Sequence, residues 1–360
     1  MDETVCLLPG ACVSLLIYGA NGYTGRLIVP IAMARGLRPI LAGRDSAAVN
    51  ALAAECRLEA RPFALDDPAA IDRALSGVSL VLHCAGPFSK TSRAMVDACL
   101  RTGAHYLDIT GEIPVFEACS ARDAEARARG ILLLPGVGFD VVPSDCLAAH
   151  LHRRLPDATE LVLAFRTVGG VSRGTALTMI ENLGMSGAIR RAGRITPVPA
   201  AFHARMIPFT DTPVLAVTIP WGDVSTAFHS TGIPDVRVYT AMPASQHRVL
   251  RLSRSLGWLL QSRFVQHQLS SRVRAGRAGP SESTRARGGS FFWGEARNAA
   301  GQVVTSRLQG PEGYTLTADT AVRCVQRVLA GNAPIGFQTP SRAFGADFVL
   351  EVDGVTRTDL

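Results

Sequence analysis

The sequence predicts an α/β protein in which a doubly wound parallel sheet is followed by a second region of mixed α+β structure. Strand and helix patterns alternate from about residue 12 to residue 150, and the first strand ends in a glycine-rich turn. After about residue 155 the strand patterns are separated by longer, irregular connections. Regular alternation is typical of parallel sheets, because each crossover between neighbouring strands needs a helix. We therefore expect two domains, over residues 1–150 and 151–360.

The first strand, residues 15–18, runs into a turn that has glycine at every third position. Glycine allows the backbone to turn tightly and to approach a pyrophosphate, whose charge then lies on amide donors at a helix N-terminus. An ordinary strand-to-helix turn without a ligand is the alternative. The turn predicts a Rossmann dinucleotide site formed by Gly19, Asn21, Gly22, Tyr23, Thr24 and Gly25.

The second strand ends where a Rossmann domain recognises the adenosine ribose, about 20 residues beyond the last glycine. Arg44 occupies its tip, and a guanidinium binds a phosphate in a bidentate manner. Asp45 follows, and successive strand residues point to opposite faces. These residues favour NADP(H) over NAD, with a solvated loop cation as the alternative role of Arg44. Asp66, after a third strand over residues 59–65, is expected near the adenine.

The fourth strand, residues 78–84, leads into a turn of small residues. Its carboxyl end should lie in the crevice where an open α/β sheet binds its ligand. Ala85, Gly86 and Pro87 are therefore expected to approach the cofactor, and a plain strand-to-helix turn is the alternative. Further strands are predicted at 105–110 and 131–134, and further helices at 92–102 and 116–129.

The second region shows strand patterns at 161–167, 213–219 and 236–240, which predict one antiparallel or mixed sheet. A helix is expected from Arg173 onward, with Ser172 as its N-cap. Residues 275–289, rich in Gly, Arg and Ser, predict a loop. A helix over 316–330 precedes a glycine and is expected to pack back on the first domain.

Composition limits the class of protein. Hydrophobic content of 47% with 19% charged residues indicates a folded chain rather than a disordered one. The net charge of +7 is too dispersed to indicate a nucleic-acid partner. The eight cysteines are scattered, with no Cys-x-x-Cys pair, so we expect no metal site and a reduced, cytoplasmic protein. No apolar run reaches the roughly 18 residues of a membrane span.

Residues 247–277 form a basic stretch that contains no carboxylate. Its leucines, among them Leu252, Leu256 and Leu259, recur near helical spacing, and its cations are Arg248, Arg251, Arg254, Arg263, Arg272, Arg274 and Arg277. A helix that faces the core or a second subunit is the favoured interpretation, and it predicts a homodimer. Contact with an anionic membrane surface or with a carrier-bound acyl group is the less favoured role.

Several segments together resemble the saccharopine dehydrogenase-like oxidoreductases, in particular the branch with bacterial trans-acting enoyl reductases. In chain order they are YGANGYTG at 18–25, AGRD at 42–45, CAGPF at 84–88, YLDITGE at 106–112 and PGVGFDVVPSD at 135–145. The resemblance covers nearly the whole chain and is weaker after residue 150. It implies a Rossmann domain that holds NAD(P)(H), followed by a substrate domain with a mixed sheet. The chain lacks the histidine that saccharopine reductases carry in the last of these turns, which argues against saccharopine as the substrate.

The resemblance implies hydride transfer, which needs a group that supplies or removes a proton near the nicotinamide. Asp140 and Glu112 are the leading candidates, since both follow strands of the predicted sheet, and helix capping is their alternative role. Lys90 would act as an acid only if burial lowered its pKa, and a solvated lysine at a helix start is its alternative.

The preferred hypothesis is an NADP-dependent reductase of a C=C (enoyl) or C=N acceptor that is bound between the domains. The substrate is then a small molecule or an acyl, lipid-like group. A nucleotide-binding scaffold or redox sensor without turnover is the second hypothesis. An amino-acid-forming dehydrogenase of the saccharopine type is the third.

Overall fold

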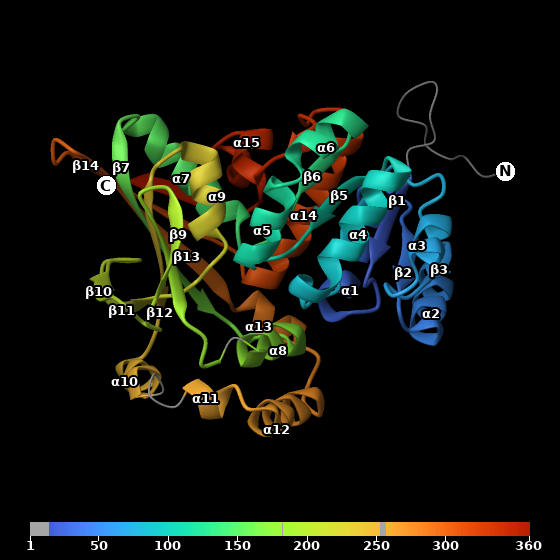
Figure 1. The fold of residues 1–360 in the computed structure, drawn as a ribbon, viewed down its shortest axis with the longest axis horizontal. Coiled ribbons are helices and arrows are strands. Elements are labelled where there is room, and N and C mark those ends of the chain that lie inside the picture. The colour runs from blue at the N-terminus through green and yellow to red at the C-terminus, as the bar shows by residue number, and fades with distance from the viewer. Residues whose placement is uncertain (1–13, 182, 253–256) are drawn as a thin grey trace.

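A computed structural model describes residues 14–181, 183–252 and 257–360 of the chain, and Figure 1 shows their arrangement. The first part of the chain forms a layered α/β domain at the right of this view. The later part forms a second sheet at the left, with several helices around it. The predicted fold class is confirmed, because one sheet is parallel and the other is mixed.

The first sheet is parallel throughout and has the strand order β15-β6-β5-β4-β1-β2-β3. Its strands are β1 (Leu15–Tyr18), β2 (Ile40–Gly43), β3 (Ala60–Pro62), β4 (Leu80–His83), β5 (His105–Asp108), β6 (Leu132–Leu134) and β15 (Gly336–Phe337). The order reverses between β1 and β4, so the carboxyl ends of these two strands border the crevice that binds ligands in doubly wound folds.

Helices cover both faces of this sheet. One face packs on α1 (Tyr23–Ala34), α2 (Ser46–Cys56) and α14 (Gly313–Leu329), and the other on α3 (Pro68–Ala74), α4 (Phe88–Thr102), α5 (Ile113–Ser120) and α6 (Asp123–Arg129). All four residues of β1 are buried. This explains its continuous apolar run, because a strand covered on both faces has no solvent side to make polar.

The chain returns to the first domain near its C-terminal end. Helix α14 packs against α1, and Figure 1 shows it among the helices of that domain. Arg35, at the end of α1, forms an ion pair with Asp319 of α14. Strand β15 then adds to the edge of the sheet beside β6. The first domain is thus completed by residues that lie beyond the second sheet in the sequence.

Helix α7 (Val142–Arg154) connects the two sheets. Among the described strands of the second sheet, only the pairing of β7 with β12 is parallel. The strands are β7 (Ala158–Val168), β8 (Gly187–Arg191), β9 (Arg194–Val198), β10 (Ala204–Ile207), β11 (Val214–Thr218), β12 (Asp235–Ala241), β13 (Gly289–Asn298), β14 (Val303–Gly310) and β16 (Thr356–Asp359). The hairpin of β8 and β9 was not expected from the sequence. Many of its residues are only partly buried, so apolar and polar residues do not alternate clearly along the two strands.

The remaining helices are α8 (Arg173–Glu181), α9 (Asp223–Thr231), α10 (Ala244–Leu252), α11 (Gly257–Leu260), α12 (Arg263–Arg274), α13 (Glu282–Ala286) and α15 (Pro340–Phe344), with a 3-10 turn at Phe348–Glu351. Two local expectations were wrong. The predicted helix over 116–129 is split into α5 and α6, because Arg122 has a non-helical backbone. The predicted loop over 275–289 contains α13, which the Ser281 side chain caps.

Within the described ranges, no helix is both long enough and apolar enough to cross a membrane.

Candidate functional site

The glycine-rich turn lies between the ends of β1 and β4. Gly19 has a φ of +81°, and a Cβ at this position would lie 2.9 Å from Ala85. A Cβ on Gly25 would lie 2.5 Å from the Gly19 carbonyl oxygen, so helix α1 packs directly on the turn. Gly22, in contrast, is exposed, although a Cβ there would lie 3.1 Å from the Gly19 carbonyl oxygen. Gly19 and Gly25 therefore shape the turn, and Gly22, which has no side chain, leaves the exposed surface of the turn accessible to a ligand.

The N-terminus of α1 is suited to an anion. Gly22 is its N-cap and provides no side chain to accept the amide hydrogens of the first turn. Those amides have no partner inside the helix, and the helix dipole adds positive potential at this end. The Asn21 side chain packs over Gly43 at the end of β2, and Thr24 is half-buried. The arrangement fits the pyrophosphate of a dinucleotide.

The ends of β2 and β3 meet beside Tyr18. Asp45 points back and caps α2, accepting the Ala48 amide at 3.1 Å. Arg44 is exposed and forms no ion pair or hydrogen bond with the described part of the chain. Burial raises the pKa of Tyr18 to about 12, and this pKa is lowered by Arg44 and raised by Asp66. Arg44 and Asp66 therefore both lie near the Tyr18 side chain. Because Arg44 is exposed and has no partner among the described residues, it is available to bind a 2′-phosphate.

The turn after β4 contacts the glycine-rich turn through Ala85. The Thr91 hydroxyl donates to the Ala85 carbonyl at 2.7 Å and fixes this turn to helix α4. Gly86 is exposed, and Pro87 is the N-cap of α4. These residues border the same crevice as Gly19, as the order of the strands requires.

Glu112 caps α4 from a neighbouring loop. Its two carboxylate oxygens accept the amides of Phe88 at 2.8 Å and Ser89 at 2.9 Å. The carboxylate thereby satisfies two amides that the N-cap Pro87 cannot satisfy with a side chain. The structure thus gives Glu112 the capping role that stood as its alternative, and its role in catalysis stays a prediction.

Asp108 ties the ends of β5 and β6 together. Its carboxylate accepts the Tyr106 hydroxyl at 2.7 Å, the Thr110 amide at 3.0 Å and the Gly136 amide at 2.9 Å. Burial raises the pKa of Asp108 to about 6, although these hydrogen bonds oppose the shift. The Asp108 and Tyr106 side chains are fully buried. We therefore assign this pair a structural role, which is to hold the loops that follow β5 and β6.

Asp140 lies at the point where these loops meet the second domain. A Cβ on Gly111 would lie 2.8 Å from the Asp140 Oδ2, so the carboxyl rests on the Gly111 backbone. Its own backbone carbonyl accepts the Trp221 indole N–H at 2.7 Å. Within the described ranges, the carboxyl group has no hydrogen-bond partner in the protein. Burial, and then the charge of Glu112, raises the pKa of Asp140 to about 7.

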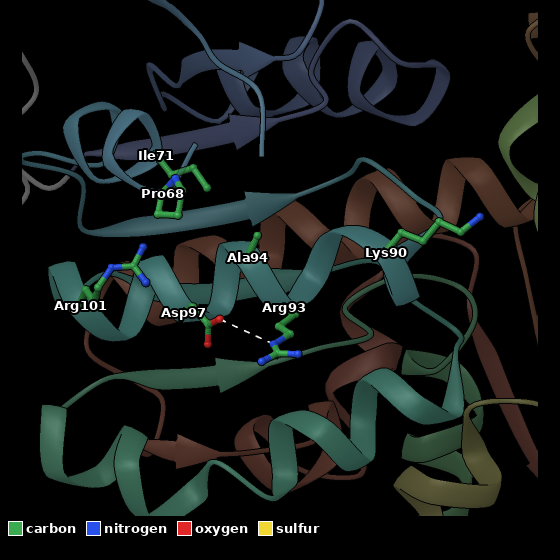
Figure 2. Close-up of a pocket in the computed structure, with 7 residues that line it drawn as sticks. All are labelled: Pro68, Ile71, Lys90, Arg93, Ala94, Asp97 and Arg101. Atoms are coloured by element: carbon green, nitrogen blue, oxygen red, sulfur yellow. Dashed lines mark ion pairs between the residues drawn. The ribbon is translucent and has the colours of Figure 1, made fainter. Parts of the chain in front are cut away.

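Lys90 lies on the exposed side of α4. Its ammonium is 2.6 Å from the Glu181 carboxylate of α8, and 66% of its side chain is accessible. Figure 2 shows it at one end of a shallow groove of about 260 Å³ between α3 and α4. Arg93 and Asp97 form an ion pair at 3.9 Å along this groove. Lys90 is therefore exposed and ion-paired, and its role in proton transfer stays a prediction.

The basic stretch forms α10, α11 and α12, of which α12 packs against α8. The Gln266 side-chain amide donates to the Ile180 carbonyl at 2.8 Å, while Phe264 remains 74% exposed. Arg254 and Leu256 lie outside the described residues. Its role in dimer formation, or at a membrane, stays a prediction.

Two residues of the site, Trp221 and Asp223, could not be identified from the sequence. Trp221 reaches Asp140 from the second domain, 81 residues later in the chain. Asp223, the first residue of α9, is fully buried, and neither carboxyl oxygen has a hydrogen-bond partner in the described part of the chain. Burial raises the pKa of Asp223 well above its ordinary value. Neither residue belongs to a motif, so only the fold brings them here.

Comparison with known proteins identifies the first domain. Residues 15–134 match the family described as "Saccharopine dehydrogenase NADP binding domain". The chain is 29% identical over 182 residues to the trans-acting enoyl reductase of Mycobacterium leprae, covering 46% of this chain and 44% of the relative. It is 25% identical over 214 residues to the saccharopine dehydrogenase-like oxidoreductase of Mus musculus, covering 51% and 50%.

The chain therefore spans about half the length of the curated relatives it matches. The apo saccharopine dehydrogenase (L-Glu forming) of Saccharomyces cerevisiae aligns over 97% of this chain and 100% of that one. Its TM-score is 0.65 and its sequence identity is 14%, which establishes a common fold.

Proposed function

Since residues 15–134 belong to the saccharopine dehydrogenase NADP binding domain family, we propose that the chain is an NADP-dependent oxidoreductase. It transfers a hydride to a C=C or C=N acceptor that lies between the two domains. Asp140 carries this proposal, because a half-buried carboxyl group without a partner among the described residues is available to a substrate. Bound NADPH would supply the hydride, and its pyrophosphate would lie on the glycine-rich turn.

Asp140 acts as the general acid in this proposal. A pKa of about 7 keeps a large fraction of its carboxyl group protonated near neutral pH. Efficient general acids have a pKa near the working pH, because the proton is then both present and readily released. The proton passes from the carboxyl to the acceptor atom beside the one that receives the hydride. The carboxylate regains its proton from solvent, since the side chain is only half-buried.

The surroundings of Asp140 favour an uncharged, apolar acceptor such as an enoyl group. The Trp221 ring lies beside the Phe165 ring with centroids 4.8 Å apart, and the Phe139 ring lies 5.9 Å from the same ring. The charge that acts on the pKa of Asp140 is another carboxylate, Glu112. An anionic amino-acid substrate would be repelled there, which makes the amino-acid-forming reaction the less supported alternative.

Activity measurements test the acid directly. We expect the purified protein to oxidise NADPH with at least one member of a panel of enoyl, imine and keto acceptors, followed by absorbance at 340 nm. Asp140→Asn should lower kcat by about 10²–10⁴-fold, the usual contribution of a general acid. In the wild type, kcat should fall as the pH rises through about 7, because the reduction uses the protonated form of Asp140.

The outcomes separate the hypotheses. NADPH binding without oxidation of any acceptor would instead support a nucleotide-binding scaffold. Turnover that Asp140→Asn leaves unchanged would remove this residue from the mechanism. Glu55→Gln, an exposed change on α2, is the control and should have the wild-type rate.

A further inference from the structure

Tyr23, the first residue of α1, is held by the second domain. Its hydroxyl donates to the Pro280 carbonyl at 2.8 Å, and the Arg285 guanidinium donates to the same hydroxyl at 3.1 Å. The Arg285 guanidinium also donates to the Pro280 carbonyl at 3.1 Å, which closes a ring of three contacts. These residues are more than 250 positions apart in the chain. A cation from the second domain thus contacts the side chain of the first residue of the helix whose N-terminus would receive the pyrophosphate.

The segment that carries Arg285 fits closely around Tyr23. A Cβ on Gly279 would lie 2.5 Å from the Tyr23 ring. At the other end of the segment, a Cβ on Gly288 would lie 2.5 Å from the Val168 carbonyl oxygen. Both glycines are therefore needed for the close approach. The short helix α13 between them places Arg285 in a defined position.

Tyr314 of α14 also contacts Tyr23 and holds it in this position. The ring of Tyr314 meets the Tyr23 ring edge-on, with centroids 5.0 Å apart. The Tyr314 hydroxyl accepts the Ser172 amide at 2.6 Å and lies 2.8 Å from the Thr175 hydroxyl. Helix α8, which begins here, reaches Glu181 and its ion pair with Lys90 of α4. Figure 1 shows α8 and α13 below the ends of α1 and α4.

The charge of Arg285 is only partly compensated. Within the described ranges Arg285 forms no ion pair. Burial raises the pKa of Glu312, which caps α14, and the charge of Arg285 opposes this rise. Its other N–H groups form no hydrogen bond with the residues that the structure describes and could bind an anion, since the guanidinium carries five and the contacts above use those of one nitrogen. A guanidinium binds phosphate oxygens with paired hydrogen bonds.

We propose that Arg285 is a cofactor-binding residue, which the second domain brings to the N-terminus of α1 to bind the pyrophosphate of the dinucleotide. Tyr23 is its positioning residue. This inference rests on the proposed NADP-dependent function. It assigns two different cations to two different phosphates, with Arg44 at the 2′-phosphate and Arg285 at the pyrophosphate. The dinucleotide is then held by both domains.

Binding measurements test the assignment without any substrate. The dissociation constants of NADPH and NADH are measured by nucleotide fluorescence for the wild type and for Arg285→Ala, Arg285→Lys and Tyr23→Phe. We expect Arg285→Ala to weaken both nucleotides by the same factor, about 10- to 100-fold, because both contain the pyrophosphate. Arg285→Lys should lose less, and Tyr23→Phe should lose about 3- to 10-fold, since the hydroxyl that accepts from Arg285 and positions it is removed.

A fragment separates binding from structure. Adenosine 2′-monophosphate lacks the pyrophosphate, so Arg285→Ala should leave its affinity, measured by calorimetry, at the wild-type value. Arg44→Ala should weaken it. Arg287→Ala is the matched control, because Arg287 is exposed on the same segment and, among the described residues, its guanidinium donates a hydrogen bond only to the Ser283 carbonyl.

Each outcome has a distinct meaning. If the wild type binds neither NADPH nor NADH, the proposed function itself is wrong. If the wild type binds them and Arg285→Ala matches Arg287→Ala, only the present assignment is wrong. Equal losses for the fragment and for NADPH would show that Arg285 merely supports the fold, and would also overturn the assignment. If Arg285→Ala does not fold, Arg285→Lys and Tyr23→Phe decide by the same comparison.

Discussion

At the scale of single residues, the directions in which the Arg44 and Asp45 side chains point support a preference for NADP over NAD. Asp45 turns back to cap α2, while Arg44 remains exposed without an ion pair in the described part of the chain. The sequence predicted this difference, because successive residues at the end of a strand point to opposite sides. It did not predict that Asp140 has a pKa of about 7, since that value depends on atoms that other segments place around the carboxyl.

Replacing Arg44 tests the preference for NADP. Arg44→Ala should weaken NADPH binding by about 1–3 kcal/mol, the range for lost hydrogen bonds to a charged group. NADH has no 2′-phosphate, so its affinity should change little. Isothermal titration of both nucleotides measures the two effects, with the highly exposed Arg93→Ala as control. An equal loss for NADPH and NADH would contradict the assignment of Arg44 to the 2′-phosphate.

At the scale of elements, carboxylates fix the starts of helices around the site. Asp45 and Asp67 cap α2 and α3 from the residues just before them. The sequence allows such contacts to be predicted, because donor and acceptor are only two or three residues apart. Glu112 caps α4 from 23 and 24 residues away, and this contact depends on β4 and β5 being neighbours. The loop between β5 and α5, which carries Glu112, thus stabilises the start of α4.

Removing the Glu112 carboxylate tests its capping role. Glu112→Ala should lower the free energy of unfolding by about 0.5–2 kcal/mol, because two amides at the start of α4 lose their acceptor. Urea denaturation followed by circular dichroism measures this change. Glu55→Ala, on the exposed side of α2, should leave the free energy of unfolding near that of the wild type. A variant as stable as the wild type would argue against the cap and would return Glu112 to the candidates for catalysis.

At the scale of the whole molecule, buried polar contacts join the two domains. Arg190 of β8 is 4% exposed and lies 2.9 Å from the Glu117 carboxylate of α5. The Ser225 hydroxyl donates to the same carboxylate at 2.5 Å, and the His229 imidazole lies 3.6 Å from it. Figure 1 shows α5 and α9 side by side at this contact. Together with α14 and β15, these contacts fix the second domain against the first.

The Glu117 carboxylate should make stability depend on pH. His229 first, and then Ser225 and Arg190, lower the pKa of Glu117 to about 2 from its ordinary value of 4.5. A depressed carboxyl pKa stabilises the folded state above the unfolded pKa, and this contribution is lost as the pH falls from about 4.5 towards 2. At pH 7, Glu117→Gln should therefore lower the free energy of unfolding by about 1.5–3 kcal/mol, because Arg190 loses a charged partner.

Urea denaturation of the wild type and Glu117→Gln at pH 7 and pH 3.5 measures this dependence. The difference between the two proteins should be smaller at the lower pH. A difference that is the same at both values would mean that the charge of Glu117 does not contribute. Glu55→Gln again serves as the control, since the exposed Glu55 carboxylate forms no ion pair in the described part of the chain.

The sequence by itself determined the parallel sheet, the glycine-rich turn and the cation at the tip of β2. Each of these depends on neighbouring residues, whose periodicity and turn chemistry are visible in the chain. The tertiary structure alone decided that Glu112 caps α4, that Trp221 holds the Asp140 backbone and that Arg285 meets Tyr23. The physical reason is that burial, charge and hydrogen-bond partners at these atoms come from segments that only the folded chain brings into contact.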